Sequence, residues 1–423
     1  MKALMRGAKV AALAGLVAAV AGCGGGGSEN PPGTVIPTGI VAPAALPGPY
    51  PVACSNVAQD FTRMAPGENA QDYWEGLPGG GPSARYASAL IADPADALAA
   101  TVTTSDDGSL YGRFAGKDVA FTVLTCYPTT TTNARPDYAL PTGRVVPRMQ
   151  TGADAPILPD AAARYPVLLF SHGYGGSPLS GDYLTAISWF ASHGYVVVAP
   201  FHGDPRFSDL RVEDISDAIK ILSNLRDFVA LQTLRPRSLS ASLDLMLAHP
   251  QWRDHLDPAQ VGGFGGSMGG ESLMLLGGAG LTTSAGLAWT TLPVEPRLKA
   301  AVGYVPYFGE PLLPAFGRDQ HGLDNVTLPY LAISGTSDTT APLAMTEQGI
   351  RQLKGNRELV SLQGVRHGFD EASTDDIFTW SLTFLDANVR GLTSARQQLA
   401  TMASVKGGGD DRVVVPWNGP AGP

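Results

Sequence analysis

The sequence contains a serine in a setting that suits nucleophilic attack. Ser267 lies in Gly265-Gly266-Ser267-Met268-Gly269, a G-x-S-x-G pattern between a predicted strand (260–264) and a helix predicted from about Gly269. A sharp strand-to-helix turn needs small residues around the serine, and it places the hydroxyl at a helix N-terminus. There the amide of Met268 would face developing negative charge. The alternative is an ordinary glycine-rich turn, because the segment 262–270 is rich in glycine.

A serine hydroxyl needs a base, and the base needs a carboxylate to orient it. In folds that use this turn, the acid and the histidine follow the serine in that order, on loops after later strands. Asp338 follows the apolar run 330–334, and His367 follows the run 358–362. His367 is the one histidine that lies C-terminal to Asp338. We therefore expect a Ser267–Asp338–His367 triad, with Glu310 as the competing acid.

A second oxyanion donor is expected from the glycine-rich loop in Phe170-Ser-His172-Gly173-Tyr174-Gly175-Gly176, which follows another apolar run. The glycines allow backbone amides to turn inward, and we predict Tyr174 as the donor beside Met268. His172 is predicted to have a structural role, with its ring bonded to this loop. The alternative here is a simple glycine-rich connection between a strand and a helix.

The elements that must position these residues alternate between short apolar runs and helical stretches. Apolar runs separated by helices are typical of parallel strands that are buried on both faces. This pattern predicts an α/β fold with a doubly wound, mostly parallel sheet, an N-terminal extension and loop insertions. Strands are expected at 119–125, 167–170, 195–200, 260–264, 298–305, 328–334 and 358–362, and helices at 182–193, 212–249, from 269, at 344–353 and at 377–389.

The N-terminus has the features of an export signal. Three basic residues precede an apolar run (10–20) that is too short to span a bilayer, and the run ends in Val20-Ala21-Gly22-Cys23. This ending resembles the lipobox of bacterial lipoproteins, which implies acylation of Cys23; a plain signal peptide and a weak membrane helix are the alternatives. The predicted organisation is signal peptide 1–22, flexible tether 23–48, N-terminal extension 49–117, hydrolase domain 118–405 and C-terminal tail 406–423, in which 413–416 could add an edge strand.

Charge and cysteine content narrow the possible partners. The formal net charge is −9, and removal of the signal with its three basic residues would make it −12. An acidic chain without a basic run is a poor candidate for binding nucleic acid. In an exported protein Cys54 and Cys126 could form one disulfide, with two separate buried thiols as the alternative. His202 and Asp204 have no further ligand at metal-site spacing, so we expect no metal and no cofactor.

Several of these motifs together resemble a known group of enzymes. The stretch 165–205, with SHGYGG and FASHGYVVVAPFHGD, is similar to the platelet-activating-factor acetylhydrolase and dienelactone-hydrolase branch of the α/β hydrolases. LAISGTSDTTAP (331–342) resembles the acid loop of bacterial cutinases and polyester hydrolases, and GGSMGG matches their nucleophile turn. The sequence departs from true dienelactone hydrolases in having Ser267 for their cysteine. It departs from the acetylhydrolases because its predicted triad acid, Asp338, follows a later strand, as in the cutinases. The insertion 307–327 has no counterpart; lining an acyl pocket, forming a lid and ordinary loop packing are all open to it.

We therefore predict a serine carboxylic ester hydrolase, lipase-like, that acts through an acyl-enzyme on Ser267. An amidase or peptidase of the same fold and a non-catalytic, surface-anchored binding protein are the alternatives. The expected substrates are small, lipid or polyester esters. The lipid anchor predicts a lipoprotein of the cell envelope, and the absence of Asp after Cys23 favours the outer membrane.

Overall fold

The computed structural model describes residues 37–55, 58–77, 85–152, 154–208, 224–310 and 313–420. The predicted signal peptide, Cys23 and the first part of the helix predicted at 212–249 lie outside these residues. The described residues belong to one compact unit.

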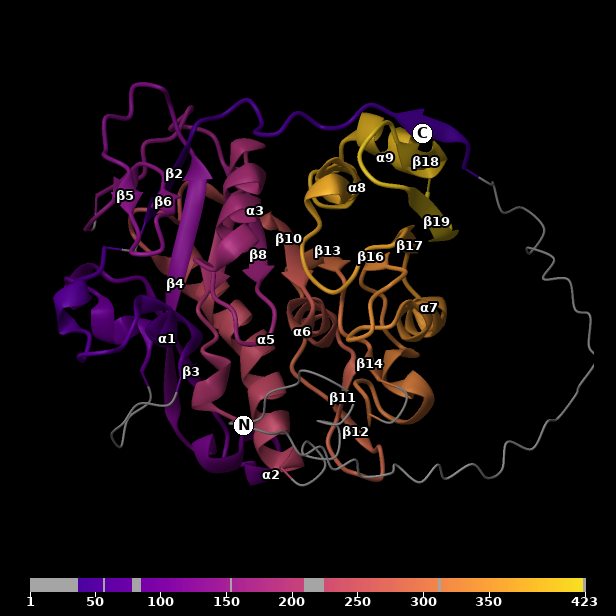
Figure 1. Cartoon of the computed structure of the whole chain (residues 1–423), viewed down its shortest axis with the longest axis horizontal. Helices are drawn as coiled ribbons and strands as arrows, with labels where there is room; N and C mark the ends of the chain where they lie inside the picture. Colours follow the sequence, from indigo (N-terminus) through magenta and orange to yellow (C-terminus); the bar gives the residue numbers. More distant parts are fainter. Residues whose placement is uncertain are drawn as a thin grey trace, which may run out of the picture. The chain divides into compact units, whose positions relative to one another are not determined.

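A mixed sheet of 11 strands runs through the described part of the chain (Figure 1). Its six central strands, from β17 to β9, are parallel to their neighbours, and antiparallel β19 and β4 flank them. The order along the sheet is β19 (Asp411–Val415), β17 (Arg357–Leu362), β16 (Tyr330–Gly335), β13 (Leu298–Tyr304), β10 (Leu256–Gly266), β8 (Tyr165–Ser171), β9 (Val196–Pro200), β4 (Asp118–Pro128), β2 (Val52–Ser55) and β7 (Met149–Gln150), with β3 (Ala99–Thr103) paired to β4.

Helices cover both faces of this sheet, because its central strands are apolar on both sides. In β8, Leu168 and Phe170 pack with α3 (Gly181–Ser192), α8 (Thr374–Asn388) and α9 (Thr393–Thr401). The alternate residues Val167 and Leu169 pack with α5 (Leu225–Ala248), α6 (Met268–Leu276) and α7 (Leu343–Gln352). The predicted doubly wound, mostly parallel α/β fold is confirmed.

The segment 49–117, predicted as an N-terminal extension, is part of the main sheet. It contributes β2, β3 and the short helices α1 (Ala70–Glu75) and α2 (Gly108–Tyr111). Cys54 in β2 lies directly opposite Cys126 in β4, and the two form a disulfide. Outside the main sheet, short strand pairs are formed by β5 (Tyr138–Ala139) with β6 (Val145–Val146), β11 (Gly280–Thr282) with β12 (Trp289–Thr291), and β14 (Gly309–Glu310) with β15 (Leu313–Pro314).

Both ends of the described chain are docked, which corrects the predicted end of the tether and confirms an edge strand in the predicted tail. β1 (Gly39–Val41) pairs in parallel with β18 (Met402–Val405), and the amide of Gly48 donates to Ser192 Oγ at 2.7 Å. Residues 37–48 are therefore part of the folded unit and not of a tether. At the other end, β19 pairs with β17 and extends the sheet. The edge strand considered at 413–416 is thus confirmed, and it forms at 411–415 because Val413, Val414 and Val415 supply a β-branched run next to β17.

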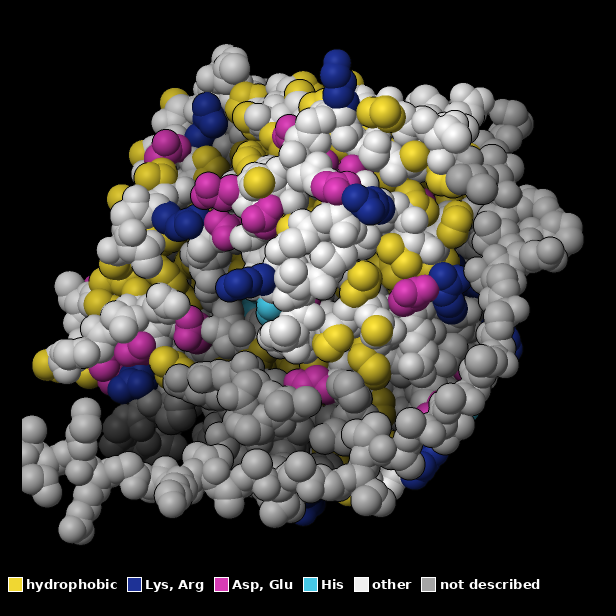
Figure 2. Space-filling model, turned by 45° about the vertical axis from the view of Figure 1, so that its right-hand side comes forward, with side chains coloured by type: hydrophobic (Ala, Val, Ile, Leu, Met, Phe, Trp, Pro, Cys, Tyr) yellow, Lys and Arg dark blue, Asp and Glu magenta, His cyan; other side chains and the backbone are white. Residues whose placement is uncertain are grey.

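Two further features of the described residues are the apolar character of their helices and the distribution of charge on one face. In the described ranges, no helix combines the length and the apolar character that crossing a bilayer requires. On the coloured part of the face in Figure 2, Lys and Arg side chains stand singly among Asp and Glu and form no continuous basic patch.

Candidate active site

Three predicted residues meet at one edge of the sheet. Ser267 directly follows β10, Asp338 follows β16 by three residues, and His367 follows β17 by five residues. These strands are parallel, so their carboxyl ends lie at the same edge, where the loops of such sheets form binding sites. The topology therefore brings together residues that are 71 and 29 positions apart in the sequence.

The turn that carries Ser267 is strained and tightly packed. Ser267 has φ 53° and ψ −122°, a region that non-glycine residues rarely adopt. A Cβ on Gly269 would lie 1.9 Å from the carbonyl oxygen of Ser171, and one on Gly265 would lie 2.3 Å from the carbonyl carbon of Gly269. Small residues are thus required where α6 passes over β8 and β10, and the half-buried serine lies at the N-terminus of α6.

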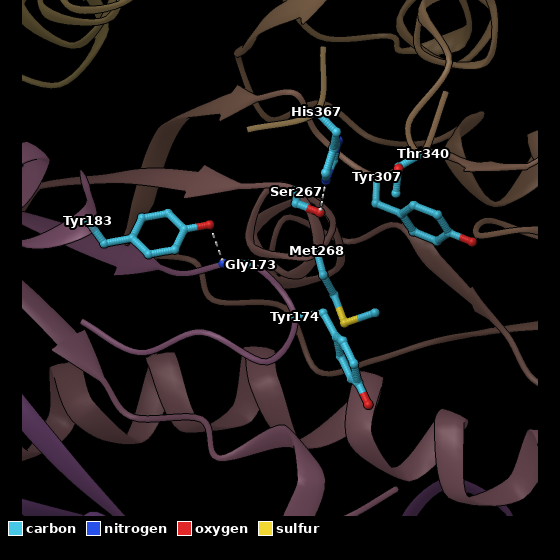
Figure 3. Close-up of a pocket in the computed structure, with 8 residues that line it drawn as sticks. All are labelled: Gly173, Tyr174, Tyr183, Ser267, Met268, Tyr307, Thr340 and His367. Atoms are coloured by element: carbon cyan, nitrogen blue, oxygen red, sulfur yellow. Dashed lines mark hydrogen bonds between the residues drawn. The ribbon is translucent and has the colours of Figure 1, made fainter. Parts of the chain in front are cut away.

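The side chains of the three residues form a continuous hydrogen-bonded chain. Ser267 Oγ lies 2.9 Å from His367 Nε2 (Figure 3). On the other side of the ring, His367 Nδ1 lies 2.8 Å from Asp338 Oδ2. An ionised carboxylate can only accept, so Nδ1 carries the proton, and Nε2 is left to accept from the serine hydroxyl. The Asp338 side chain is fully buried, while that of His367 is 25% exposed. The imidazole therefore has a fixed orientation and remains open to water on one side.

Asp338 is itself held by its loop. Its second oxygen, Oδ1, accepts hydrogen bonds from the amides of Thr340 at 2.9 Å and Ala341 at 2.8 Å. These bonds leave Oδ2 directed at His367. The competing acid, Glu310, is buried in β14, and the carboxylate within hydrogen-bond distance of the imidazole is that of Asp338.

The two predicted oxyanion donors border the same pocket. Met268 is the first residue of α6, so its amide belongs to the turn whose N–H groups have no partner inside the helix. Tyr174 lies on the loop after β8, on the same side of Ser267 as the Met268 side chain (Figure 3). The neighbouring amide of Gly173 donates to the Tyr183 hydroxyl at 2.9 Å. This bond occupies the Gly173 amide and helps to fix the loop on which Tyr174 lies.

His172 and His202 are buried beneath this loop. His172 Nδ1 is 2.8 Å from the carbonyl oxygen of Gly173, and its Nε2 accepts from the His202 amide at 3.1 Å. Burial, together with the positive charge of Arg235, lowers the pKa of His172 to about 4. His202 bonds to Ser171 Oγ at 2.9 Å and Ser238 Oγ at 3.0 Å, and burial lowers its pKa well below the usual value. Both rings therefore stay neutral and hold backbone and serine groups in place.

The pocket above Ser267 has a volume of about 230 Å³. Among the residues that the structure describes, its lining includes no Lys, Arg, Asp or Glu; the described lining residues are Gly173, Tyr174, Tyr183, Ser267, Met268, Tyr307, Thr340 and His367 (Figure 3). Sequence reasoning did not identify Tyr183, which comes from α3, or Thr340. Tyr307 begins the insertion considered for an acyl pocket and lines the site, whereas Phe308 and Phe316 pack into the core. In the described ranges, no group of three or more His, Cys, Asp or Glu side chains is arranged to bind a metal.

Comparison with known proteins shows that part of the chain resembles one family. Residues 148–248 match the family model described as Chlorophyllase, which represents α/β-hydrolase-like serine esterases. No curated protein matches the chain at a significant level. The matched segment spans β7 to α5, with the loop of Tyr174, and ends before Ser267. It covers 101 of 423 residues and supports hydrolase activity. The chain thus has the α/β-hydrolase fold, and about a quarter of it is similar to the Chlorophyllase family.

Proposed function

We propose that the protein is a serine carboxylic ester hydrolase that works through an acyl-enzyme. The observation that carries the proposal is the hydrogen-bonded chain from Ser267 through His367 to Asp338, with separations of 2.9 and 2.8 Å. A nucleophile, a base and an orienting carboxylate in this geometry are the recurring arrangement for acyl transfer. The strained backbone at Ser267 further supports a functional role.

The proposed reaction has two steps. His367 Nε2 takes the proton of Ser267 Oγ while the oxygen forms a bond to the ester carbonyl carbon, and the carbonyl oxygen becomes an oxyanion. The amides of Met268 and Tyr174 stabilise this charge, and each such donor typically contributes ~100- to 1,000-fold in turnover. The carbon–oxygen bond to the alcohol then breaks, and the alcohol leaves with the proton held by His367. Water, activated by the same imidazole, releases the acid and restores Ser267.

The pocket favours a small, uncharged ester. Its described lining has three tyrosines and a methionine but no Lys, Arg, Asp or Glu, so an ionised acyl or alcohol group would have no partner among these residues. Its volume of about 230 Å³ lies below the ~300–1,000 Å³ of pockets that hold drug-sized ligands. We therefore place short-chain and small aryl esters ahead of bulky lipid or polyester substrates.

Hydrolysis of a series of p-nitrophenyl esters from short to long acyl chains tests the proposal. Ser267→Ala should lower turnover at least ~1,000-fold and abolish labelling by a fluorophosphonate probe. Ser284→Ala, on the loop between β11 and β12, is the matched control and should retain both. Full esterase activity in Ser267→Ala would overturn the mechanism. A wild-type protein that is folded but inactive on every ester would favour an amidase or a binding protein.

The export prediction is proposed on the N-terminal sequence alone. Lys2, Arg6 and Lys9, the apolar run 10–20 and Cys23 support a cleaved, acylated lipoprotein of the cell envelope. Cys23→Ala should move the protein from the membrane fraction to the soluble fraction. Continued membrane association of that variant would contradict lipid anchoring.

A further inference from the structure

An arginine is completely buried beneath the candidate active site. Arg235, in the middle of α5, is 1% exposed, and its partner Asp204 is 0% exposed. Arg235 Nη1 lies 2.7 Å from Asp204 Oδ1 and 2.6 Å from Oδ2. Burying a charge pair costs desolvation energy that its attraction often fails to offset, so stability alone is a weak reason for this pair.

The ion pair holds the loop of Tyr174 on both sides of that residue. Arg235 Nη2 donates to the carbonyl oxygen of His172, two residues before Tyr174. Asp204 Oδ2 accepts from the amide of Gly175, the residue after Tyr174, at 3.1 Å. The position of the Tyr174 amide is thus tied from both directions to one guanidinium.

The same guanidinium also holds the turn of Met268. Arg235 Nε donates to Ser272 Oγ at 3.1 Å, and this hydroxyl donates to the carbonyl oxygen of Met268 at 2.8 Å. Arginine presents its donors in a rigid planar fork, so contacts made by its different nitrogens have a fixed relative position. One buried group therefore links the loop after β8 to the first turn of α6.

We infer that Arg235 is a positioning residue that sets the spacing between the Tyr174 and Met268 amides. This inference rests on the proposed function, in which those two amides bind the oxyanion. Donors must lie within about 0.2 Å of their hydrogen-bond distance to the oxyanion, and misplacement by ~1 Å can cost about 100-fold in rate. Asp204 and Ser272 transmit this constraint to the loop and to the helix.

Variants can separate the two connections. Ser272→Ala removes the connection to α6 and leaves the ion pair intact. Arg235→Lys keeps a charge beside Asp204 but loses the rigid fork that reaches all three partners. Arg297→Gln is the matched control, because it breaks the contact of Arg297 with the buried Glu295 at 2.6 Å. The control pair lies just before the start of β13, whereas Ser267 lies just after the end of β10. Because these two strands are parallel, the control pair and Ser267 are at opposite ends of the strands.

The measurements are kcat and KM on the best p-nitrophenyl ester, with active sites counted by prolonged fluorophosphonate labelling. We expect kcat per labelled site to fall about 10-fold in Ser272→Ala and about 100-fold in Arg235→Lys, with KM changed less than about 3-fold. Arg297→Gln should lower the thermal midpoint without changing kcat per labelled site. Unchanged kcat per labelled site in both Ser272→Ala and Arg235→Lys would overturn the inference. That result is distinct from failure of the proposed function, in which the wild type itself shows no activity that depends on Ser267.

Discussion

Glu271 provides a test of the interior beneath the candidate nucleophile. This residue lies on α6, four positions after Ser267, and is 1% exposed. Its Oε1 accepts from Gln232 Nε2 at 2.5 Å, and its Oε2 is buried with no hydrogen-bond partner among the described residues. Burial raises the pKa of this carboxyl from 4.5 to about 8, although the bond from Gln232 and the charge of Arg235 oppose the shift.

The raised pKa makes stability depend on pH in a defined direction. Between pH 4.5 and about 8 the native state keeps the Glu271 proton and the unfolded chain has released it. The unfolded state then binds fewer protons, so the free energy of unfolding falls as pH rises, by about 1.4 kcal/mol per unit. The stabilisation is complete below pH 4.5 and is lost as pH rises through about 8. Over the whole window the loss is about 5 kcal/mol.

Glu271→Gln removes the titration and keeps an acceptor for Gln232. We expect the variant to show little change in unfolding free energy near pH 5 and to be several kcal/mol more stable than wild type near pH 8. Urea unfolding of both proteins at intervals from pH 5 to pH 8 measures the difference, which isolates Glu271 from other titrating groups. Parallel curves for the two proteins across this range would refute the assignment of a buried, protonated Glu271.

Three further predictions concern other parts of the fold. Replacing Cys54 and Cys126 by Ala should lower the free energy of unfolding by about 4 kcal/mol, as expected for a 72-residue separation, and reduction of the wild type should have a similar effect in urea unfolding. Gly269→Ala should yield little folded protein, and what folds should lack esterase activity, because the added Cβ would overlap the Ser171 carbonyl. A normal yield of protein with a normal kcat would contradict this packing. His172 should remain neutral down to about pH 4, so stability should fall as pH drops from 6.5 towards 4; ring resonances in NMR that titrate near pH 6.5 would disprove this.

The residues with chemistry were predictable because local patterns mark them. Ser267 lies between a strand run and a helix, and Asp338 and His367 each follow an apolar run. The strands of a parallel sheet are buried on both faces. Each of them therefore appears in the sequence as a continuous apolar run, which can be recognised without knowing its neighbours in the sheet. The central sheet and the meeting of these residues at one edge follow from that alternation.

Other features depend on contacts that the local sequence does not show. Arg235 reads as an ordinary polar residue of a helix, and its burial depends on Asp204, which is 31 positions earlier. In β3 (Ala99–Thr103) buried and exposed positions alternate. The strand consists of alanine, threonine and one valine, so the hydropathy of the segment gives little indication of a strand. Residues 37–48 are rich in Pro, Gly and Ala, and they are ordered by β18 and by Ser192, far along the chain.

The position of β19 has a consequence for the order in which the molecule is completed. This strand is the edge partner of β17, the strand that leads to His367, and it is formed by residues 411–415. A ribosome-bound chain that stops short of this point contains the segment of Ser267 but leaves β17 without its outer neighbour. The outer support of the imidazole is thus translated after both Ser267 and His367, and a product truncated before residue 411 carries the serine without full support of its base.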